Sequence, residues 1–208
     1  MIAALLLMIA PGVGWERISR AQRGVVFIVI FYLLPLLALS SVGEAYRLVH
    51  WGMIQGEVPH RRAFSLGETV VFEAAQLVLS LVVVFVAAQL VKAVGETFHG
   101  RHRYIESFTA LAYGLGPLFL LRWLDVVKDL SPWLSWAIGL LLSIRVLYHG
   151  LPRMMQPDPP HAFGLFLMSA FLLLLTTGLA ELVAACYLQG KFTRLDAIIS
   201  ALAARLPF

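Results

Sequence analysis

Residues 25–42 read VVFIVIFYLLPLLALSSV, a stretch that contains no charged side chain. A helix of this length rises about 27 Å at 1.5 Å per residue, which approaches the thickness of about 30 Å of a bilayer's hydrocarbon core. A backbone surrounded by lipid must satisfy its own hydrogen bonds, and a helix does so within a single segment. The stretch therefore predicts a transmembrane helix.

Four more stretches are apolar over a similar length, and each contains at most one charged residue. Together the five predict spans at about residues 25–42, 74–91, 107–124, 130–148 and 162–187. Gly114, Gly116 and Pro117 predict a kink in the third span. The connections between the spans are too short to form a further domain. Because the spans themselves are helical, the sequence predicts an all-α fold. We expect a polytopic membrane helix bundle of five transmembrane helices that forms one integral membrane domain over residues 1–208.

The segment ahead of the first span has a different pattern. Residues 1–10 are apolar but would span only about 15 Å as a helix, and Pro11-Gly12 interrupts them. We expect residues 1–20 to form an N-terminal interfacial segment that lies on the membrane surface, anchored by Trp15. A cleaved signal peptide is the alternative, although the basic n-region typical of one is missing.

Composition narrows the classes of partner. Charged residues make up 13% of the chain, about half the share usual in soluble proteins, and the net charge is +4. The basic residues are scattered among the connections, so we expect them to meet anionic lipid headgroups, and we expect no nucleic-acid partner. They divide evenly between the two sides of the predicted bundle, so the positive-inside rule gives no orientation. Cys186 is the single cysteine, which excludes an intrachain disulfide.

The connection between the last two spans carries an ordered set of residues. After an aromatic helix end at Tyr148 come a Gly-Leu-Pro triplet, a Met-Met pair, a proline and an Ala-x-Gly start of the final span. These residues are Gly150, Leu151, Pro152, Met154, Met155, Pro157, Ala162 and Gly164. Gly150 permits backbone angles closed to other residues and Pro152 rigidifies the exit from the helix, so we expect a short, stiff hairpin here.

This order resembles the Yip family, the Ypt/Rab-interacting five-span membrane proteins, and specifically its bacterial branch. Phe98-His99-Gly100 with Arg101 and Arg103 is similar to the family's Gly-basic loop, and residues 11–18 are similar to its segment before the first span. The resemblance implies five helices, a cytoplasmic N-terminus, a bacterial inner (cytoplasmic) membrane and a role in membrane organisation. Eukaryotic members bind Rab-type GTPases through a longer N-terminal region with an acidic-aromatic motif. The residues ahead of the first span carry no such motif, so we do not expect GTPase binding.

Five ionisable side chains lie within or at the edges of the predicted spans, where such residues commonly pair or carry function. They are Glu73, Arg122, Asp125, Arg145 and Glu181. Arg122 and Asp125 are three residues apart on one helix face, so we expect them to pair locally. Antiparallel packing separates Arg145 from Glu181, and Glu181 is better matched in depth to Arg122 or to residues near Glu73. Structural pairing or snorkelling is the first interpretation, and a proton or substrate path is the alternative.

We predict no catalytic, cofactor or metal site. His99 and His102, and also His149 and His161, invite a metal interpretation, but zinc takes four ligands and no cysteine lies nearby. A nucleophile elbow is also missing, so we expect no enzyme activity.

Small residues recur at four-residue spacing and allow helices to approach closely in lipid, either within the bundle or against another membrane subunit or a second copy. They are Thr176, Ala180 and Ala184, then Ala110 and Gly114, then Gly139 and Ser143.

The first functional hypothesis is a non-enzymatic protein of Yip type that organises membranes or membrane-protein assembly through helix–helix contacts. The second is an accessory subunit of a larger respiratory or transport complex. The third is a small transporter or lipid-handling protein that uses Glu73, Glu181 and Arg122.

Overall fold

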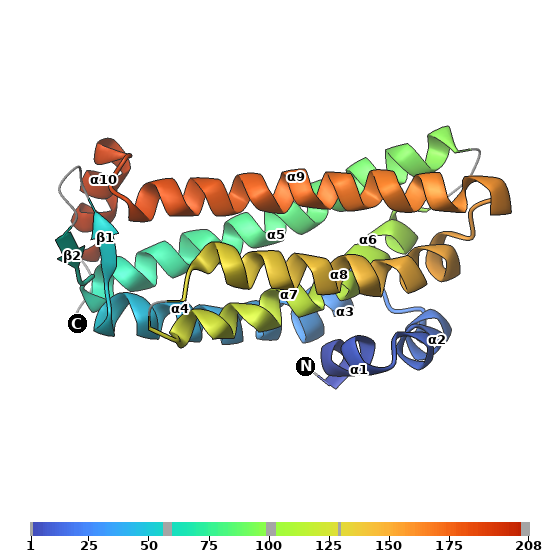
Figure 1. The fold of residues 1–208 in the computed structure, drawn as a ribbon, viewed down its shortest axis with the longest axis horizontal. Coiled ribbons are helices and arrows are strands. Elements are labelled where there is room, and N and C mark those ends of the chain that lie inside the picture. The colour runs from blue at the N-terminus through green and yellow to red at the C-terminus, as the bar shows by residue number, and fades with distance from the viewer. Residues whose placement is uncertain (1, 56–59, 99–102, 129, 205–208) are drawn as a thin grey trace.

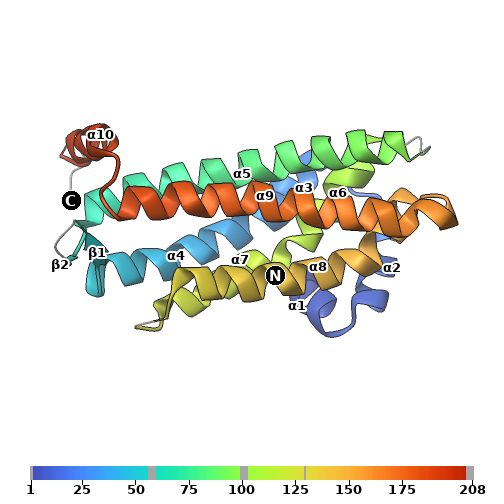
Figure 2. The same cartoon turned by 45° about the horizontal axis from the view of Figure 1, so that its top comes forward.

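Five long helical segments lie side by side in a computed structural model, which describes residues 2–55, 60–98, 103–128 and 130–204 (Figure 1; Figure 2). Each is long and apolar enough to cross a membrane: Val25–His50, Leu66–Thr97, Tyr104–Val126, Pro132–Met155 and Pro159–Leu188. The predicted all-α bundle of five membrane helices is confirmed. The first two spans run past their predicted ends at Val42 and Ala74. The charged residues just beyond those ends, Glu44, Arg47 and Glu73, are buried within protein and do not mark the bilayer surface.

The first span changes its winding at a proline. It consists of α3 (Val25–Ile28), a π-helical turn η1 (Val29–Leu33) and α4 (Leu34–His50). Pro35 has no N–H to donate, and its ring would clash with the carbonyl four residues earlier in a regular helix. The wider π turn lies directly before Pro35, with the amide of Leu34 donating to the carbonyl of Val29. A change of winding of this kind is a common cause of helix bending.

The third span is broken where the sequence predicts a kink. It consists of α6 (Tyr104–Gly114), α7 (Gly116–Leu121) and a 3₁₀ segment, η2 (Arg122–Val126). Of its apolar window, 72% is buried, compared with 22–44% in the other four spans. The third span is therefore the centre of the bundle, and the other four enclose it.

The fourth span, α8 (Pro132–Met155), continues through the Gly-Leu-Pro motif. Gly150 has no left-handed backbone and Pro152 lies inside the helix, so the expectation that they form a hairpin is wrong. Gly150 instead provides space, because a methyl group there would overlap the ring of Trp15. The chain turns at Gln156, which has a φ of 42°. It then enters a 3₁₀ turn, η3 (Pro159–His161), and the fifth span, α9 (Ala162–Leu188).

The N-terminal segment forms two helices, α1 (Ile2–Ile9) and α2 (Pro11–Ala21), which pack along one side of the bundle (Figure 1). Trp15 of α2 is fully buried, and its indole Nε1 donates to the carbonyl oxygen of Val146 at 2.9 Å. The prediction that Trp15 anchors this segment in the interface is therefore wrong, because the ring is buried in protein. Ala4 of α1 lies against Gly116, at the break in the third span.

The second span, α5 (Leu66–Thr97), begins at the opposite end of the bundle beside two elements that the sequence does not predict. One is a hairpin of β1 (Met53–Gln55) and β2 (His60–Arg62), paired antiparallel in the register Met53↔Arg62, Ile54↔Arg61 and Gln55↔His60. The other is the helix α10 (Thr193–Ala203).

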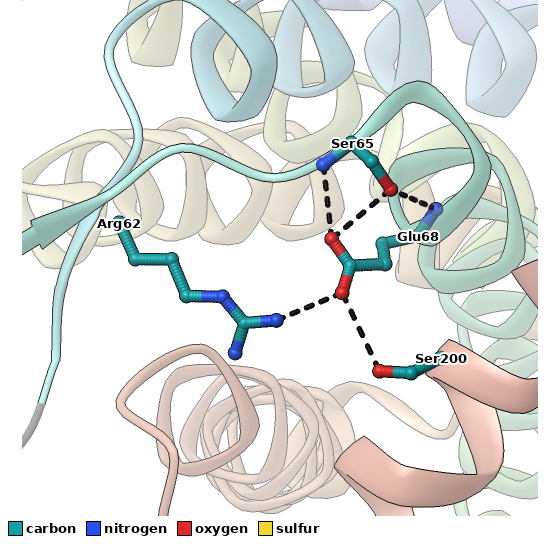
Figure 3. Close-up of polar contacts among 4 residues, drawn as sticks. All are labelled: Arg62, Ser65, Glu68 and Ser200. Carbon is teal, nitrogen blue, oxygen red and sulfur yellow. Dashed lines mark hydrogen bonds and ion pairs between the residues drawn. The ribbon is translucent and has the colours of Figure 1, made fainter.

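One carboxylate links these elements, as Figure 3 shows. Glu68 Oε2 accepts from the backbone N–H of Ser65 at 2.9 Å, and Ser65 Oγ accepts from the Glu68 amide at 3.2 Å, which is a capping box at the start of α5. Glu68 Oε1 also lies 2.8 Å from Arg62 Nη2 and accepts from Ser200 Oγ of α10 at 3.4 Å.

Candidate functional site

Four of the five spans, all except the fourth, contribute polar side chains to one region inside the bundle. We call it the polar cluster, and it consists of Glu44, Arg47, Glu73, Gln76, Arg122, Asp125 and Glu181. Glu73 is seven residues from the start of α5 (73 − 66), and Glu181 is seven from the end of α9 (188 − 181). At 1.5 Å per residue, both lie about 10 Å inside the helix ends that face β1, β2 and α10. The polar cluster is therefore within the membrane-spanning part of the bundle.

Arg122 is the hub of the polar cluster. Its Nη2 lies 2.9 Å from Glu44 Oε2 of the first span and 3.7 Å from Glu181 Oε2 of the fifth. With its amide oxygen turned toward this guanidinium, Gln76 of the second span accepts from Nη1 at 3.1 Å and from Nη2 at 2.9 Å. The Arg122 side chain is only 13% exposed. A planar guanidinium with five N–H donors can satisfy several acceptors at once, so this side chain links three spans to the third.

Asp125 does not pair with Arg122 as the spacing predicts. Among the ion pairs of the described residues, Arg122 is joined to Glu44 and Glu181, and Asp125 is in none. Asp125 is buried near Ser135 at the start of α8, and its Oδ1 has no hydrogen-bond partner. The prediction of a local pair is wrong because carboxylates from other spans occupy the guanidinium.

The polar cluster holds more acids than bases. Four carboxyl groups, those of Glu44, Glu73, Asp125 and Glu181, face two guanidinium groups, those of Arg47 and Arg122, so fully ionised acids would exceed the bases by two. Arg47 Nη2 lies 4.0 Å from Glu44 Oε1. Glu73 is 92% buried and neither of its oxygens makes a hydrogen bond, although Ser41 lies close by. Such an excess in an apolar interior can take up protons or a small cation, because isolated buried charges are costly.

A cavity of about 40 Å³ adjoins the polar cluster. Gln76, Asp125 and Glu181 line it together with Trp136 and Thr177. A buried water needs about 10–15 Å³ of such space, so a few waters fit. Small-molecule pockets measure about 300–1,000 Å³. In this conformation, the cavity is too small for a lipid headgroup or a metabolite.

The structure brings together four of the five predicted intramembrane residues: Glu73, Arg122, Asp125 and Glu181. The depth match between Glu181 and Arg122 is confirmed by their contact. Arg145 is exposed on the outside of α8 and is in no ion pair of the described residues. This position fits the snorkelling interpretation, in which a long side chain reaches toward the interface.

The sequence interpretation missed Glu44, Arg47 and Gln76. Glu44 and Arg47 follow directly after the apolar stretch 25–42, and their spacing of three residues places them on one helix face. That spacing is the signal that could have identified them. Gln76 is uncharged and lies inside an apolar stretch, so a search for charges alone does not find it.

Two of the small-residue stripes pack within the bundle. A methyl group on Gly139 would lie 2.9 Å from Leu118 Cα, so this glycine lets α8 approach the third span closely. Ser143 Oγ accepts from the amide of Leu118 at 3.2 Å. Gly114 lies against Leu147 in the same interface. These stripes are covered by other spans and are not open to a second subunit.

The described residues include no group of three or more His, Cys, Asp or Glu side chains that could hold a metal ion. His149 and His161 are among the described residues, whereas His99 and His102 lie outside them.

Comparison with known proteins gives one match. The family model described as Yip1 domain matches residues 5–180, which include most of α1, all of α2 and the first four spans, and most of the fifth. No curated protein and no solved structure matches the chain.

Proposed function

The chain belongs to the Yip1 domain family, and from that premise we propose that it organises membranes, or the assembly of other membrane proteins, through its helices and without enzymatic activity. It is an integral membrane protein with five apolar helices. We propose further that it resides in a bacterial inner membrane with its N-terminus in the cytoplasm.

One observation carries this proposal: the bundle uses its polar groups internally and presents apolar side chains outward. Arg122 is saturated by groups from three other spans, and the adjoining cavity holds only a few waters. By contrast, α9 exposes large apolar side chains along much of its length, among them Leu167 and Leu175. Such a face contacts lipid tails and is also available to helices of other proteins.

The experiment compares membranes with and without the protein on native gels. We expect at least one membrane complex to change its migration, and the wild-type chain to restore it. A photo-reactive side chain at Leu175, which is exposed, should then cross-link to a component of that complex. The same group at Leu173, which is buried in α9, is the matched control and should not. Unchanged migration of every complex, with lipid adducts alone at Leu175, would contradict the proposal. So would turnover of a lipid or peptide substrate that is lost on replacing one polar residue.

The excess of buried carboxyl groups favours a second candidate, a small transporter or lipid-handling protein that uses Glu73, Glu181 and Arg122. The test is proton, cation or lipid-scrambling flux in proteoliposomes, for the wild type and for a variant with Glu73→Gln, Glu181→Gln and Arg122→Gln. Loss of flux in this variant, with flux kept in Arg145→Gln, would favour transport. Full flux after all three changes would remove this candidate.

The third candidate is an accessory subunit of a larger complex, which the outward apolar face of α9 also suits. Extraction in mild detergent tests it. Recovery of the chain alone, at the mass of a monomer or a dimer, would count against this candidate, whereas stable co-migration with a respiratory or transport assembly would favour it.

A further inference from the structure

A recess of about 610 Å³ lies at the end of the bundle opposite the polar cluster. The residues that line it come from α2, from the starts of the first and third spans and from the end of the fourth. Figure 1 shows these elements at the same end of the bundle. Three arginines line it: Arg23, Arg103 and Arg153. Because helix ends of transmembrane spans lie at the level of the headgroups, this recess is where a lipid phosphate would meet the protein.

The arginines retain donors that a phosphate can use. Arg153 is in no ion pair of the described residues, and Arg23 donates through Nη1 to the hydroxyl of Tyr113 at 3.3 Å, which leaves its other nitrogens free of an acid. Glu106 also lines the recess, but its Oε1 accepts from Arg103 Nε at 3.1 Å and its Oε2 accepts from the Arg103 amide at 3.2 Å. This carboxylate is thereby occupied at the start of α6.

Two glutamines in the recess have an unusual backbone. Gln22 and Gln156 are the two non-glycine residues with positive φ in the described chain, at 41° and 42°, and both line the recess. They end α2 and α8, positions where glycine is the common choice because it has no side chain to clash. Glutamine at both places keeps two amide side chains, which donate hydrogen bonds, beside the arginines.

A groove of about 470 Å³ adjoins the recess and shares Ile18 and Arg23 with it. Its walls come from α1, α2 and the first span, and they include the apolar side chains of Leu6 and Phe31. Phe31 is six residues into the first span, about 9 Å from its start. The groove thus leads from the arginines into the apolar part of the bundle.

We propose that the recess and the groove together bind one anionic phospholipid, with its phosphate among Arg23, Arg103 and Arg153 and an acyl chain along α1. Charge favours an anionic over a zwitterionic lipid. The recess and the groove together are lined by four arginines, the three named above and Arg17, and by two acids, Glu106 and Asp158. The positive charges therefore exceed the negative ones by two. An inorganic phosphate would use the arginines but would leave the apolar groove empty. The proposal does not rest on the proposed function.

The test is native mass spectrometry of the full chain from nanodiscs with equal amounts of phosphatidylglycerol and phosphatidylcholine. We expect one phosphatidylglycerol to be retained in preference to phosphatidylcholine. An arginine near an anionic lipid contributes about fivefold in affinity. The double variant Arg23→Gln/Arg153→Gln should therefore bind this lipid about 25-fold more weakly. Arg20→Gln is the matched control, because Arg20 lies on α2 but pairs with Glu16 and lines neither the recess nor the groove. It should bind as the wild type does.

A second variant separates binding from folding. The variant Gln22→Gly/Gln156→Gly places glycine at two positions with a left-handed backbone, so the unfolding midpoint should rise. It also removes the two amide side chains from the recess, so lipid retention should still fall. Equal binding of the two lipids would overturn the proposal, as would wild-type binding by both double variants. Full displacement of the lipid by equimolar glycerol 3-phosphate would also overturn it, since the groove would then contribute nothing.

Discussion

Arg122→Met removes the guanidinium that joins three spans to the third. The variant keeps much of the apolar stem and loses the short contacts to Glu44 and Gln76 as well as the longer one to Glu181. Three short contacts at about 0.6 kcal/mol each, the average for hydrogen bonds between membrane helices, give about 2 kcal/mol. Breaking a buried ion pair by removing one partner costs about 3–5 kcal/mol, because a carboxylate is left unpaired. We therefore expect the free energy of unfolding to fall by about 3 kcal/mol.

The assay is reversible unfolding by sodium dodecyl sulfate in mixed micelles, followed by helical circular dichroism. Arg145→Met is the matched control, since Arg145 also lies in a span but is exposed and is in no ion pair of the described residues. We expect that change to alter stability by less than about 0.5 kcal/mol. Adding Glu181→Gln to Arg122→Met should restore at least about 1 kcal/mol, because it removes the carboxylate whose ion pair is lost, whereas Glu44 keeps its pair with Arg47.

Two results would refute this reasoning. One is a loss below about 0.5 kcal/mol in Arg122→Met, which would mean that the ion pairs contribute nothing net. The other is an equal loss in Arg145→Met, which would mean that any arginine in a span has the same effect.

Two further predictions concern packing and capping. Gly150→Ala should destabilise the protein by about 1–3 kcal/mol, because the new methyl group overlaps the Trp15 ring, whereas Gly24→Ala, which faces open space, should change stability by less than about 1 kcal/mol in the same assay. Ser65→Ala should cost about 1 kcal/mol by removing the N-cap of α5, and hydrogen exchange should show the loss mainly in the first turn, around Glu68; a uniform change over all helices would contradict this local role.

The five spans could be predicted because each is a long apolar stretch, and lipid permits little besides helices for such a segment. The break in the third span follows from Gly114, Gly116 and Pro117 for the same local reason. Local chemistry also predicts that Gly150 and Pro152 end a helix, and there it is wrong. Packing against Trp15 decides the role of Gly150, and that contact joins residues more than 130 positions apart.

The polar cluster could be predicted only in part. The depth of a residue in the membrane can be counted from the ends of its span. Such a count is enough to match Glu181 with Arg122. The partners of Arg122 depend on which spans pack next to one another in three dimensions. That packing brings Glu44 and Gln76, and not Asp125, to its guanidinium. The hydrophobic pattern of a single sequence locates each span but does not show which spans are neighbours.

Labelling of single cysteines with a membrane-impermeant maleimide tests the five-span arrangement most directly. In a Cys186→Ser background, cysteines replace four exposed residues at helix ends: Arg20, Asp158, Lys128 and Lys191. Five crossings predict that Arg20→Cys and Asp158→Cys are labelled from one side of sealed vesicles, and Lys128→Cys and Lys191→Cys from the other. Labelling of Arg20→Cys and Lys191→Cys from the same side would contradict the arrangement.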